Sequence, residues 1–253
     1  MPQRTGYSCI PTAIDSSIAN RWTWHDRVLD RAFERLERLT VKVVRAVLRG
    51  LGGSNPARLP GIRSHMDVLM ATDFFTTEVW TLGGLVTFYV LFFIHLGSRK
   101  VHIAGVTTQP NAQWMMQIAR NETMDEWGFL KPGQYLIHDG DTKFSPAFKQ
   151  IIDDAGVKRV PLPPRSPNLN AIAERWVRSV KDEVLSRLIL FGERSLWHVL
   201  HQYLAHYHAE RNHQGKDNVL LFPVSRLGPD HDGPVQCRER LGGLLKYYHR
   251  EAA

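Results

Sequence analysis

Three acidic residues, far apart in the sequence, are the side chains best suited to do chemistry: Asp73, Asp139 and Glu174. The two aspartates each lie at the end of an apolar, strand-like run, and Glu174 opens an amphipathic helix. Carboxylate oxygens are the ligands that Mg²⁺ prefers, with water completing its coordination. If folding brings the three acids together, they predict a site for a hard divalent cation that needs no histidine or cysteine.

A fourth acid, Asp141, competes with Asp139 for the second position of this site. The two flank Gly140 and would face the same side of an extended strand, so geometry alone permits either to reach a metal ion. Asp139 directly follows the apolar run 135–137, and Gly140 would let the chain turn away after it. We therefore assign Asp139 to the site and expect Asp141 to cap the following turn or helix.

The elements that must position these acids begin near residue 65. Five strand-like runs are predicted, at 66–75, 85–96, 100–107, 135–138 and 157–162. The first three form an antiparallel meander with a turn at Gly83-Gly84. Helical periodicity fills 111–124 and 145–155, and a third helix carries Glu174. This order predicts an α/β fold in which helices flank a mixed five-stranded sheet.

Periodicity and composition divide the chain into three regions. Residues 1–62 are irregular at first and then show short basic helices, so we interpret them as a short helical N-terminal segment. Within it, 40–50 faintly resembles the end of a recognition helix, which indicates a truncated helix-turn-helix. Residues 63–222 form the predicted catalytic core. Residues 223–253 form a C-terminal tail whose apolar run would pack on the core or on a second subunit.

The chain is basic, with a formal net charge of +7 over 253 residues and an isoelectric point near 9.6. A basic surface around an acidic pocket suits a phosphodiester substrate, because lysine and arginine neutralise backbone phosphates. The alternative is a soluble basic protein without a nucleic-acid partner. Charge alone does not separate the two.

Cysteine usage and hydropathy bear on location. Cys9 and Cys237 lie far apart and outside any Cys-x-x-Cys spacing, which argues against a disulfide framework or a structural zinc site. The most apolar run, 85–96, is shorter than the roughly 20 residues that a membrane span needs. The first residues lack the pattern of a signal peptide. We expect a cytoplasmic, nucleoid-associated protein with no membrane partner.

Three segments resemble one family in their order along the chain. Residues 138–144 are similar to the Asp-Asn-Gly-x-x-Phe segment of DDE transposases and retroviral-type integrases, although Gly140 and Asp141 depart from it. Residues 166–174 resemble the integrase stretch that leads into its glutamate. Residues 207–213 resemble the Tyr-Asn-x-x-Arg-x-His signature of insertion-sequence transposases. The resemblance covers roughly 65–222.

The spacing of the acids agrees with this resemblance, because Glu174 follows Asp139 by 35 positions, within the narrow range of such cores. The resemblance implies a ribonuclease-H-like core in an enzyme that cuts a DNA strand and joins the freed 3′ hydroxyl to a target phosphodiester. It implies two Mg²⁺ or Mn²⁺ ions, both bridged by Asp73, with Asp139 and Glu174 each completing one. Double-stranded DNA, as element ends and target, and further copies of the chain would be the partners.

Four further residues are predicted to contact DNA. Arg178 and Lys181 follow Glu174 by one and two helical turns, which places a cationic stripe beside the acids. Arg165 and Ser166 lie in a proline-rich loop that could move onto a substrate. The alternative for the stripe is a solvated helix face with Glu174 and Arg178 as an ion pair.

Other residues have plainer interpretations. Five histidines between His198 and His213 have the spacing of a packed helix rather than of metal ligands, and Trp176 is typical of a core residue. Two other functions stay open: a catalytically idle DNA-binding remnant of a mobile element, and a stand-alone ribonuclease-H-like nuclease. The intact set of acids disfavours the remnant, while the irregular N-terminal region favours it. Strand joining would separate the transposase from the nuclease.

Overall fold

The computed structural model describes residues 66–162, 170–223 and 234–250. The chain divides into two compact units, Met1–Ser54 and Asn55–Ala253, and all described residues belong to the second. The predicted N-terminal segment therefore lies outside the described residues. None of the helices in the described ranges is both long and apolar enough to cross a membrane.

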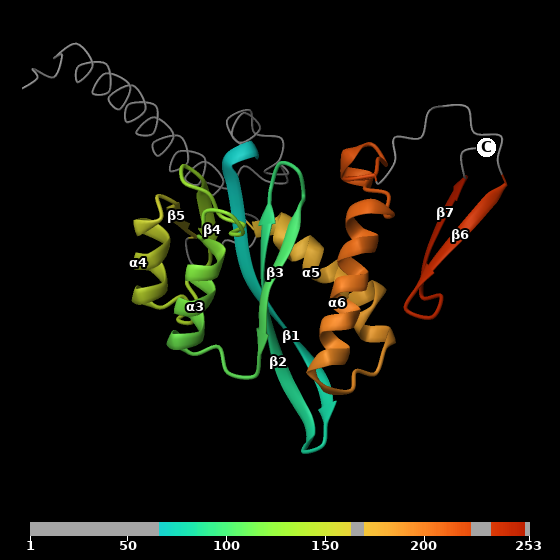
Figure 1. Cartoon of the computed structure of the whole chain (residues 1–253), viewed down its shortest axis with the longest axis horizontal. Helices are drawn as coiled ribbons and strands as arrows, with labels where there is room; N and C mark the ends of the chain where they lie inside the picture. The colour runs from blue at the N-terminus through green and yellow to red at the C-terminus, as the bar shows by residue number, and fades with distance from the viewer. Residues whose placement is uncertain (1–65, 163–169, 224–233, 251–253) are drawn as a thin grey trace, which may run out of the picture. The chain divides into compact units, whose positions relative to one another are not determined.

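A five-stranded sheet with the strand order β3-β2-β1-β4-β5 carries the fold (Figure 1). The strands are β1 Leu69–Thr81, β2 Gly84–His95, β3 Val101–Thr107, β4 Tyr135–His138 and β5 Lys158–Pro161. Strand β2 pairs antiparallel with β1 and β3, whereas β1 pairs parallel with β4, and β4 with β5. Only β2 therefore runs against the others. This sheet confirms the predicted α/β fold class with a mixed five-stranded sheet flanked by helices.

The first strand is longer than predicted, which moves Asp73 from a strand end into a strand interior. Strand β1 continues to Thr81 and pairs with β2 without interruption from Met70↔His95 to Thr81↔Gly84. Three polar residues, 76–78, follow Phe75 and interrupt the apolar signal before Val79, but one face of an antiparallel ribbon can lie in water. The predicted turn is confirmed at its end, where Gly84 has a φ of 105°.

Four helices cover the two faces of the sheet, with α3 and α4 on one side and α5 and α6 on the other (Figure 1). Their bounds are α3 Ala112–Glu122, α4 Pro146–Asp154, α5 Ala171–Glu183 and α6 Gly192–Ala209. Capping side chains fix where two of these helices, α3 and α4, begin. The Asn111 side chain accepts a hydrogen bond from the Trp114 N–H, and Ser145 accepts one from the Phe148 N–H. Each satisfies an N–H that has no partner inside its helix.

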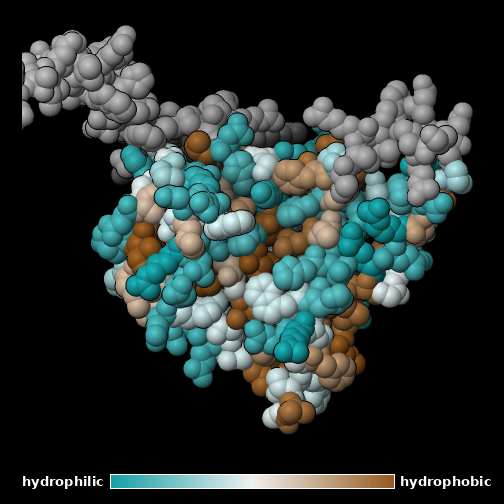
Figure 2. Space-filling model, in the orientation of Figure 1, coloured by the Kyte–Doolittle hydropathy of each residue, from teal (hydrophilic) through white to brown (hydrophobic). Residues whose placement is uncertain are grey.

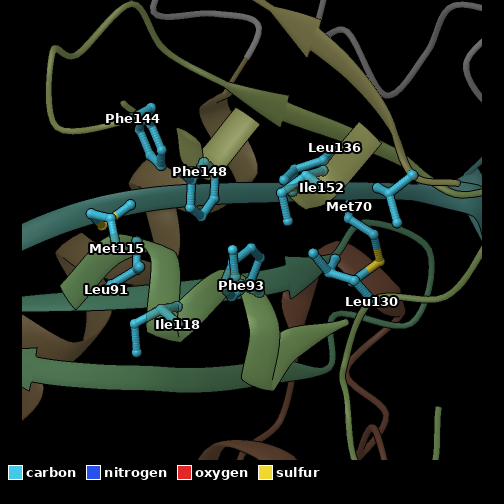
Figure 3. Close-up of a cluster of buried hydrophobic side chains, with 12 residues drawn as sticks. Met70, Leu91, Phe93, Met115, Ile118, Leu130, Leu136, Phe144, Phe148 and Ile152 are labelled. Carbon is cyan, nitrogen blue, oxygen red and sulfur yellow. The ribbon is translucent and has the colours of Figure 1, made fainter. Parts of the chain in front are cut away.

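A hydrophobic core lies between the sheet and the helices α3 and α4 (Figure 3). Because side chains alternate along a strand, Leu91 and Phe93 of β2 enter this core, while Phe92 points to the side of α5. Helix α3 packs so closely on β3 that a Cβ at Gly105 would lie 2.7 Å from the Trp114 ring. A glycine is therefore required at that position for the observed packing.

The region predicted as a C-terminal tail contains a two-stranded hairpin, β6 Val235–Arg240 and β7 Leu245–Arg250. Its attachment to α6 differs from the predicted apolar packing. Arg240 donates to both carboxylate oxygens of Glu210, at 2.6 and 2.8 Å, and Arg238 adds a longer contact of 3.4 Å. Burial alone would raise the pKa of Glu210, but the hydrogen bonds and charge of Arg240 dominate and lower it to about 2.

Candidate active site

The register of two parallel strands brings Asp73 and Asp139 together. Strands β1 and β4 pair from Leu69↔Tyr135 to Ala71↔Ile137. Asp73 and Asp139 each lie two positions beyond that last pair, so the register carries them to neighbouring places on one side of the sheet. Strand β4 ends at His138, which leaves the position of Asp139 open beside β1.

Helix α5 supplies the glutamate, and an aromatic cluster holds this helix over the sheet. Trp176 is only 1% exposed, and its ring lies 4.3 Å from that of Phe92 and 5.8 Å from that of Phe75, centroid to centroid. Phe75 is on the same face of β1 as Asp73, two residues away. The first turn of α5, with Glu174, therefore lies over the strand face that carries Asp73. The prediction that Trp176 is a core residue is confirmed.

The acids lie near enough to one another to influence the pKa of Asp73. Burial is the largest effect and raises this pKa, against the opposing effect of a hydrogen bond from the Phe74 N–H at 2.7 Å. The negative charges of Asp139, Glu174 and, least of the three, Asp141 also raise it, and the resulting pKa is about 6. The charges of the other three acids therefore all disfavour the ionised form of Asp73.

The carboxylate oxygens of Asp73, Asp139 and Glu174 are suitable ligands for a hard divalent cation, but they lie too far apart in this structure to share one. Within the described ranges, no group of three His, Cys, Asp or Glu side chains lies close enough to hold a metal ion. Carboxylates without a cation repel one another, and Asp139 accepts the Asp141 N–H at 3.1 Å. Oxygen ligands alone suit Mg²⁺, whose charge would offset the repulsion that raises the pKa of Asp73. Binding would require the three acids to draw closer.

Asp141 is engaged in its own turn. It accepts the Lys143 N–H at 2.9 Å and forms an ion pair of 2.7 Å with the Lys143 ammonium group. Burial alone would raise its pKa, but these contacts outweigh burial and lower it. Asp141 caps the turn before α4, whereas Ser145 caps the helix itself. This geometry agrees with the choice of Asp139 for the site, which stays a prediction.

Asn170 is a residue of this site that sequence reasoning missed. Its side-chain amide donates to Asp73 Oδ2 at 3.4 Å, and its own Oδ1 is buried without a hydrogen-bond partner in the described structure. A buried amide oxygen without a partner is uncommon and indicates a polar group absent from this structure. The available signal was its position, one helical turn before Glu174.

The predicted DNA-contacting residues divide into two pairs. Arg178 and Lys181 lie on the same face of α5 as Glu174, and neither forms a hydrogen bond or ion pair with the residues that the structure describes. The alternative ion pair between Glu174 and Arg178 is not formed. Arg165 and Ser166 lie outside the described residues, so their predicted role stays a prediction.

The histidines near the end of α6 serve separate contacts. His206 bonds to Glu210, His208 Nε2 accepts the Val101 N–H at 3.0 Å, and His213 bonds to the Tyr207 carbonyl. His198 and His201 are exposed on the outer face of the helix. Each ring is thus accounted for by the packing of α6 or by solvent.

The acids at the β1–β4 junction of a mixed sheet, with a glutamate on the covering helix, form the arrangement that the predicted resemblance implies. Comparison with known families agrees, since residues 155–219 match the family model "Integrase core domain". This segment contains β5, all of α5 and α6, and the signature 207–213. The predicted resemblance to the integrase-type family is thereby confirmed.

Solved structures of integrases are similar at low identity. The catalytic core domain of BIV integrase matches with a TM-score of 0.42 and 14% identity, over 59% of this chain and 88% of that one. A chain in the structure of the simian T-cell lymphotropic virus intasome in complex with PP2A regulatory subunit B56 gamma matches with a TM-score of 0.44 and 12% identity, over 72% of this chain and 66% of that one. The HTLV-2 integrase catalytic core domain in complex with magnesium matches with 0.42 and 10%, over 56% and 86%. No curated protein matches the chain.

Proposed function

We propose that this protein is a DDE-type transposase or integrase that cuts a DNA strand and transfers its 3′ hydroxyl to a target phosphodiester. The observation that carries the proposal is the meeting of Asp73 and Asp139 at the β1–β4 junction under the helix of Glu174. A carboxyl group whose pKa is raised by burial and by neighbouring acids, as that of Asp73 is, is typical of a catalytic site rather than of a structural one.

In this proposal Asp73, Asp139 and Glu174 hold two Mg²⁺ or Mn²⁺ ions. A pair of such ions supplies activation of the attacking oxygen and stabilisation of the leaving oxygen in phosphodiester chemistry. Asn170 would orient Asp73 through their hydrogen bond. Arg178 and Lys181, exposed or partly exposed beside Glu174, would hold the flanking phosphates of double-stranded DNA.

The test is a joining assay on labelled duplexes copied from the DNA that flanks the coding region, with Mg²⁺ or Mn²⁺. We expect joined products in either metal, and none in EDTA or with Ca²⁺, whose irregular, higher coordination suits this chemistry poorly. Cutting without joining would favour the stand-alone nuclease. DNA binding without either reaction would favour the idle remnant, and full turnover in EDTA would exclude a metal site.

Two neighbouring acids provide a matched pair of variants. We expect Asp139→Asn to abolish both cutting and joining while the fold persists, because it removes a ligand of the proposed ions. Asp141→Asn should keep measurable joining, because its partner is Lys143 rather than the site. Circular dichroism of both variants checks the fold. If Asp141→Asn were inactive and Asp139→Asn active, the second acid of the site would be Asp141 instead of Asp139.

The basic stripe on α5 is tested by DNA binding. Replacing Arg178 and Lys181 together by Ala should weaken binding to duplexes of every sequence, because phosphate contacts carry no sequence information. The slope of log affinity against log salt should fall by roughly one unit for each phosphate that the variant no longer neutralises. Unchanged affinity and slope would assign the stripe to ordinary solvated surface.

A further inference from the structure

A cavity of about 350 Å³ lies beside helix α5, on a different face from Glu174. It is bounded by α5, the end of α6, the short turn η5 Gln214–Lys216 and the β2–β3 connection. Its lining from α5 includes Ile172, Arg175, Trp176 and Ser179. At about 100° per residue, these four positions are centred about 140° around the helix from the Glu174 stripe. The cavity is therefore separate from the candidate active site.

The charge of this cavity is positive and only partly neutralised. Four cationic side chains line it, and none of the described residues that line it is acidic. Arg211 is paired with Glu183 at 2.6 Å, and the Lys216 ammonium group donates to the Gly97 carbonyl at 2.5 Å. The other two, Arg99 and Arg175, form no side-chain hydrogen bond or ion pair within the described part of the chain.

The two unpaired arginines disfavour each other's charge. Burial lowers the pKa of Arg99 and outweighs the opposing effect of Tyr207, and the positive charge of Arg175 makes a further, smaller contribution that lowers it. Arg99 also has a φ of 65°, a conformation that costs a non-glycine residue of the order of 1 kcal/mol. An anion between Arg99 and Arg175 would offset the repulsion of their charges and accept hydrogen bonds from both guanidinium groups.

A residue that lines the cavity also has a buried donor without an acceptor. Trp176 is 1% exposed, and its indole Nε1 is buried with no hydrogen-bond partner in the described structure. Buried indole N–H groups normally find an acceptor. Two guanidinium groups and the ring of Trp176 therefore line the cavity, and none of their N–H donors has a described side-chain acceptor.

The transposase-like signature of the sequence builds one wall of this cavity. Tyr207, Arg211 and His213 all line it. The His213 ring packs edge-on against Tyr207 with centroids 4.6 Å apart, and its Nε2 bonds to the Tyr207 carbonyl at 2.8 Å. The Arg211 guanidinium lies 6.0 Å from the centre of the same ring. The spacing of these three residues thus serves the cavity and not the acidic site.

We propose that this cavity binds a phosphate group, held by Arg99, Arg175 and the Trp176 indole N–H. Guanidinium groups pair with phosphate oxygens through two parallel hydrogen bonds, and a compact trianion or dianion would neutralise both arginines. The phosphate can come from a DNA backbone or from a free phosphorylated molecule. The proposal does not depend on catalysis by the acids.

Binding is tested first with inorganic pyrophosphate as the probe, in EDTA and at constant ionic strength. Isothermal titration and thermal unfolding would compare the full-length chain with Arg175→Gln, which alters an exposed position of α5. Arg120→Gln is the matched control, because it removes an exposed arginine from α3, on the other side of the sheet. We expect pyrophosphate to raise the unfolding midpoint of the wild type and the control, and Arg175→Gln to bind at least tenfold more weakly.

A second measurement follows the Trp176 indole N–H by NMR, which a nonspecific ionic effect would leave in place. Pyrophosphate should shift this resonance in the wild type and not in Arg175→Gln. Equal affinity of Arg175→Gln and Arg120→Gln for pyrophosphate, or no binding by the wild type together with an unchanged DNA salt slope in Arg175→Gln, would overturn the proposal.

A DNA-binding arm identifies the source of the phosphate. If it is a backbone phosphate, Arg175→Gln should also lower affinity for duplex DNA and reduce the salt slope by about one unit. Loss of pyrophosphate binding with an unchanged DNA salt slope would assign the cavity to a free phosphorylated molecule. Both outcomes leave the active-site variants at Asp139 and Asp141 as an independent test of the proposed reaction.

Discussion

Asp73 is the residue whose surroundings conflict most with the charge that its proposed role requires. Burial and the neighbouring acids raise its pKa from 3.8 to about 6, so without a cation the folded chain holds its proton more tightly than the unfolded chain does. Stability contributed by this group is present at low pH and is lost as pH rises through about 6. A bound cation would stabilise the ionised form of Asp73, which burial and the neighbouring acids otherwise disfavour.

We expect Asp73→Asn to stabilise the metal-free protein at pH 7.5 by the order of 2 kcal/mol, because it removes a charge that burial disfavours. The gain should vanish below about pH 4, where the wild-type carboxyl is protonated in both states. Chemical unfolding at several pH values in EDTA measures it. The exposed Asp125→Asn is the control, and a destabilised Asp73→Asn at pH 7.5 would contradict the prediction.

Metal binding provides the complementary measurement for the same residue. Mg²⁺ should raise the unfolding midpoint of the wild type, increasingly so as pH rises through about 6, because the ion competes with the proton on Asp73. Asp73→Asn should lose most of this increase. Equal Mg²⁺ effects in both proteins would place the cation elsewhere.

At the scale of elements, α6 is tied to the edge strand of the sheet by a single histidine. Val101 begins β3, and its N–H donates to His208 Nε2 in the last turn of α6. Burial has the largest effect on His208, and the positive charges of Lys100 and His213 add to it; together they lower the pKa of His208 to about 4. The unfolded histidine takes up its proton near pH 6.5, so the stability from its neutral form is lost as pH falls from about 6.5 to 4.

His208→Phe should therefore destabilise the protein by about 1–3 kcal/mol at neutral pH, because it leaves the Val101 N–H without its acceptor. It should also flatten the loss of stability between pH 6.5 and 4. His198→Phe, an exposed position on the same helix, is the control. Unfolding curves across this pH range measure both effects, and a fall with acid as steep as that of the wild type would argue against the assigned role.

For the molecule as a whole, the turn end of the β1–β2 hairpin presents an apolar surface. Trp80, Leu82, Leu85 and Phe191 are all at least half exposed there, and the Trp80 N–H bonds to the Leu190 carbonyl at 2.9 Å. Figure 2 shows hydrophobic residues gathered at the lower end of this face, where the hairpin turn lies in Figure 1. Contiguous exposed apolar side chains favour contact with another protein surface.

We therefore predict that this hairpin surface contributes to self-association, in line with the further copies of the chain that the family resemblance implies as partners. Leu82→Ser with Leu85→Ser should weaken association of the chain at least tenfold, since both side chains would leave an apolar contact. Light scattering during size-exclusion chromatography measures the mass against concentration. Met124→Ser, an exposed apolar position on the other side of the sheet, is the control. The same mass for both variants at every concentration would exclude this surface.

Much of the fold could be predicted from local signals in the sequence. The strand 135–138 and the Gly83-Gly84 turn were placed correctly because an apolar run and a glycine pair act within a few residues. The predicted end of β1 was wrong because residues 76–78 are polar, and pairing with β2 keeps them extended. The hairpin near the C-terminus was missed because β6 shows no alternation of buried and exposed residues, and because an ion pair across 30 positions ties the hairpin to the end of α6.

The sequence by itself determined which acids belong to the candidate site, since their residue types, order and spacing are readable without coordinates. Only the tertiary structure decided how they meet. The parallel register of β1 and β4 sets Asp73 beside Asp139, and the packing of Trp176 on Phe92 brings Glu174 over them. The ion pair of Arg211 with Glu183 and the place of Arg175 in the wall of the cavity likewise depend on contacts between distant segments. Local propensity carries no information about such contacts, because they exist only once the chain has packed.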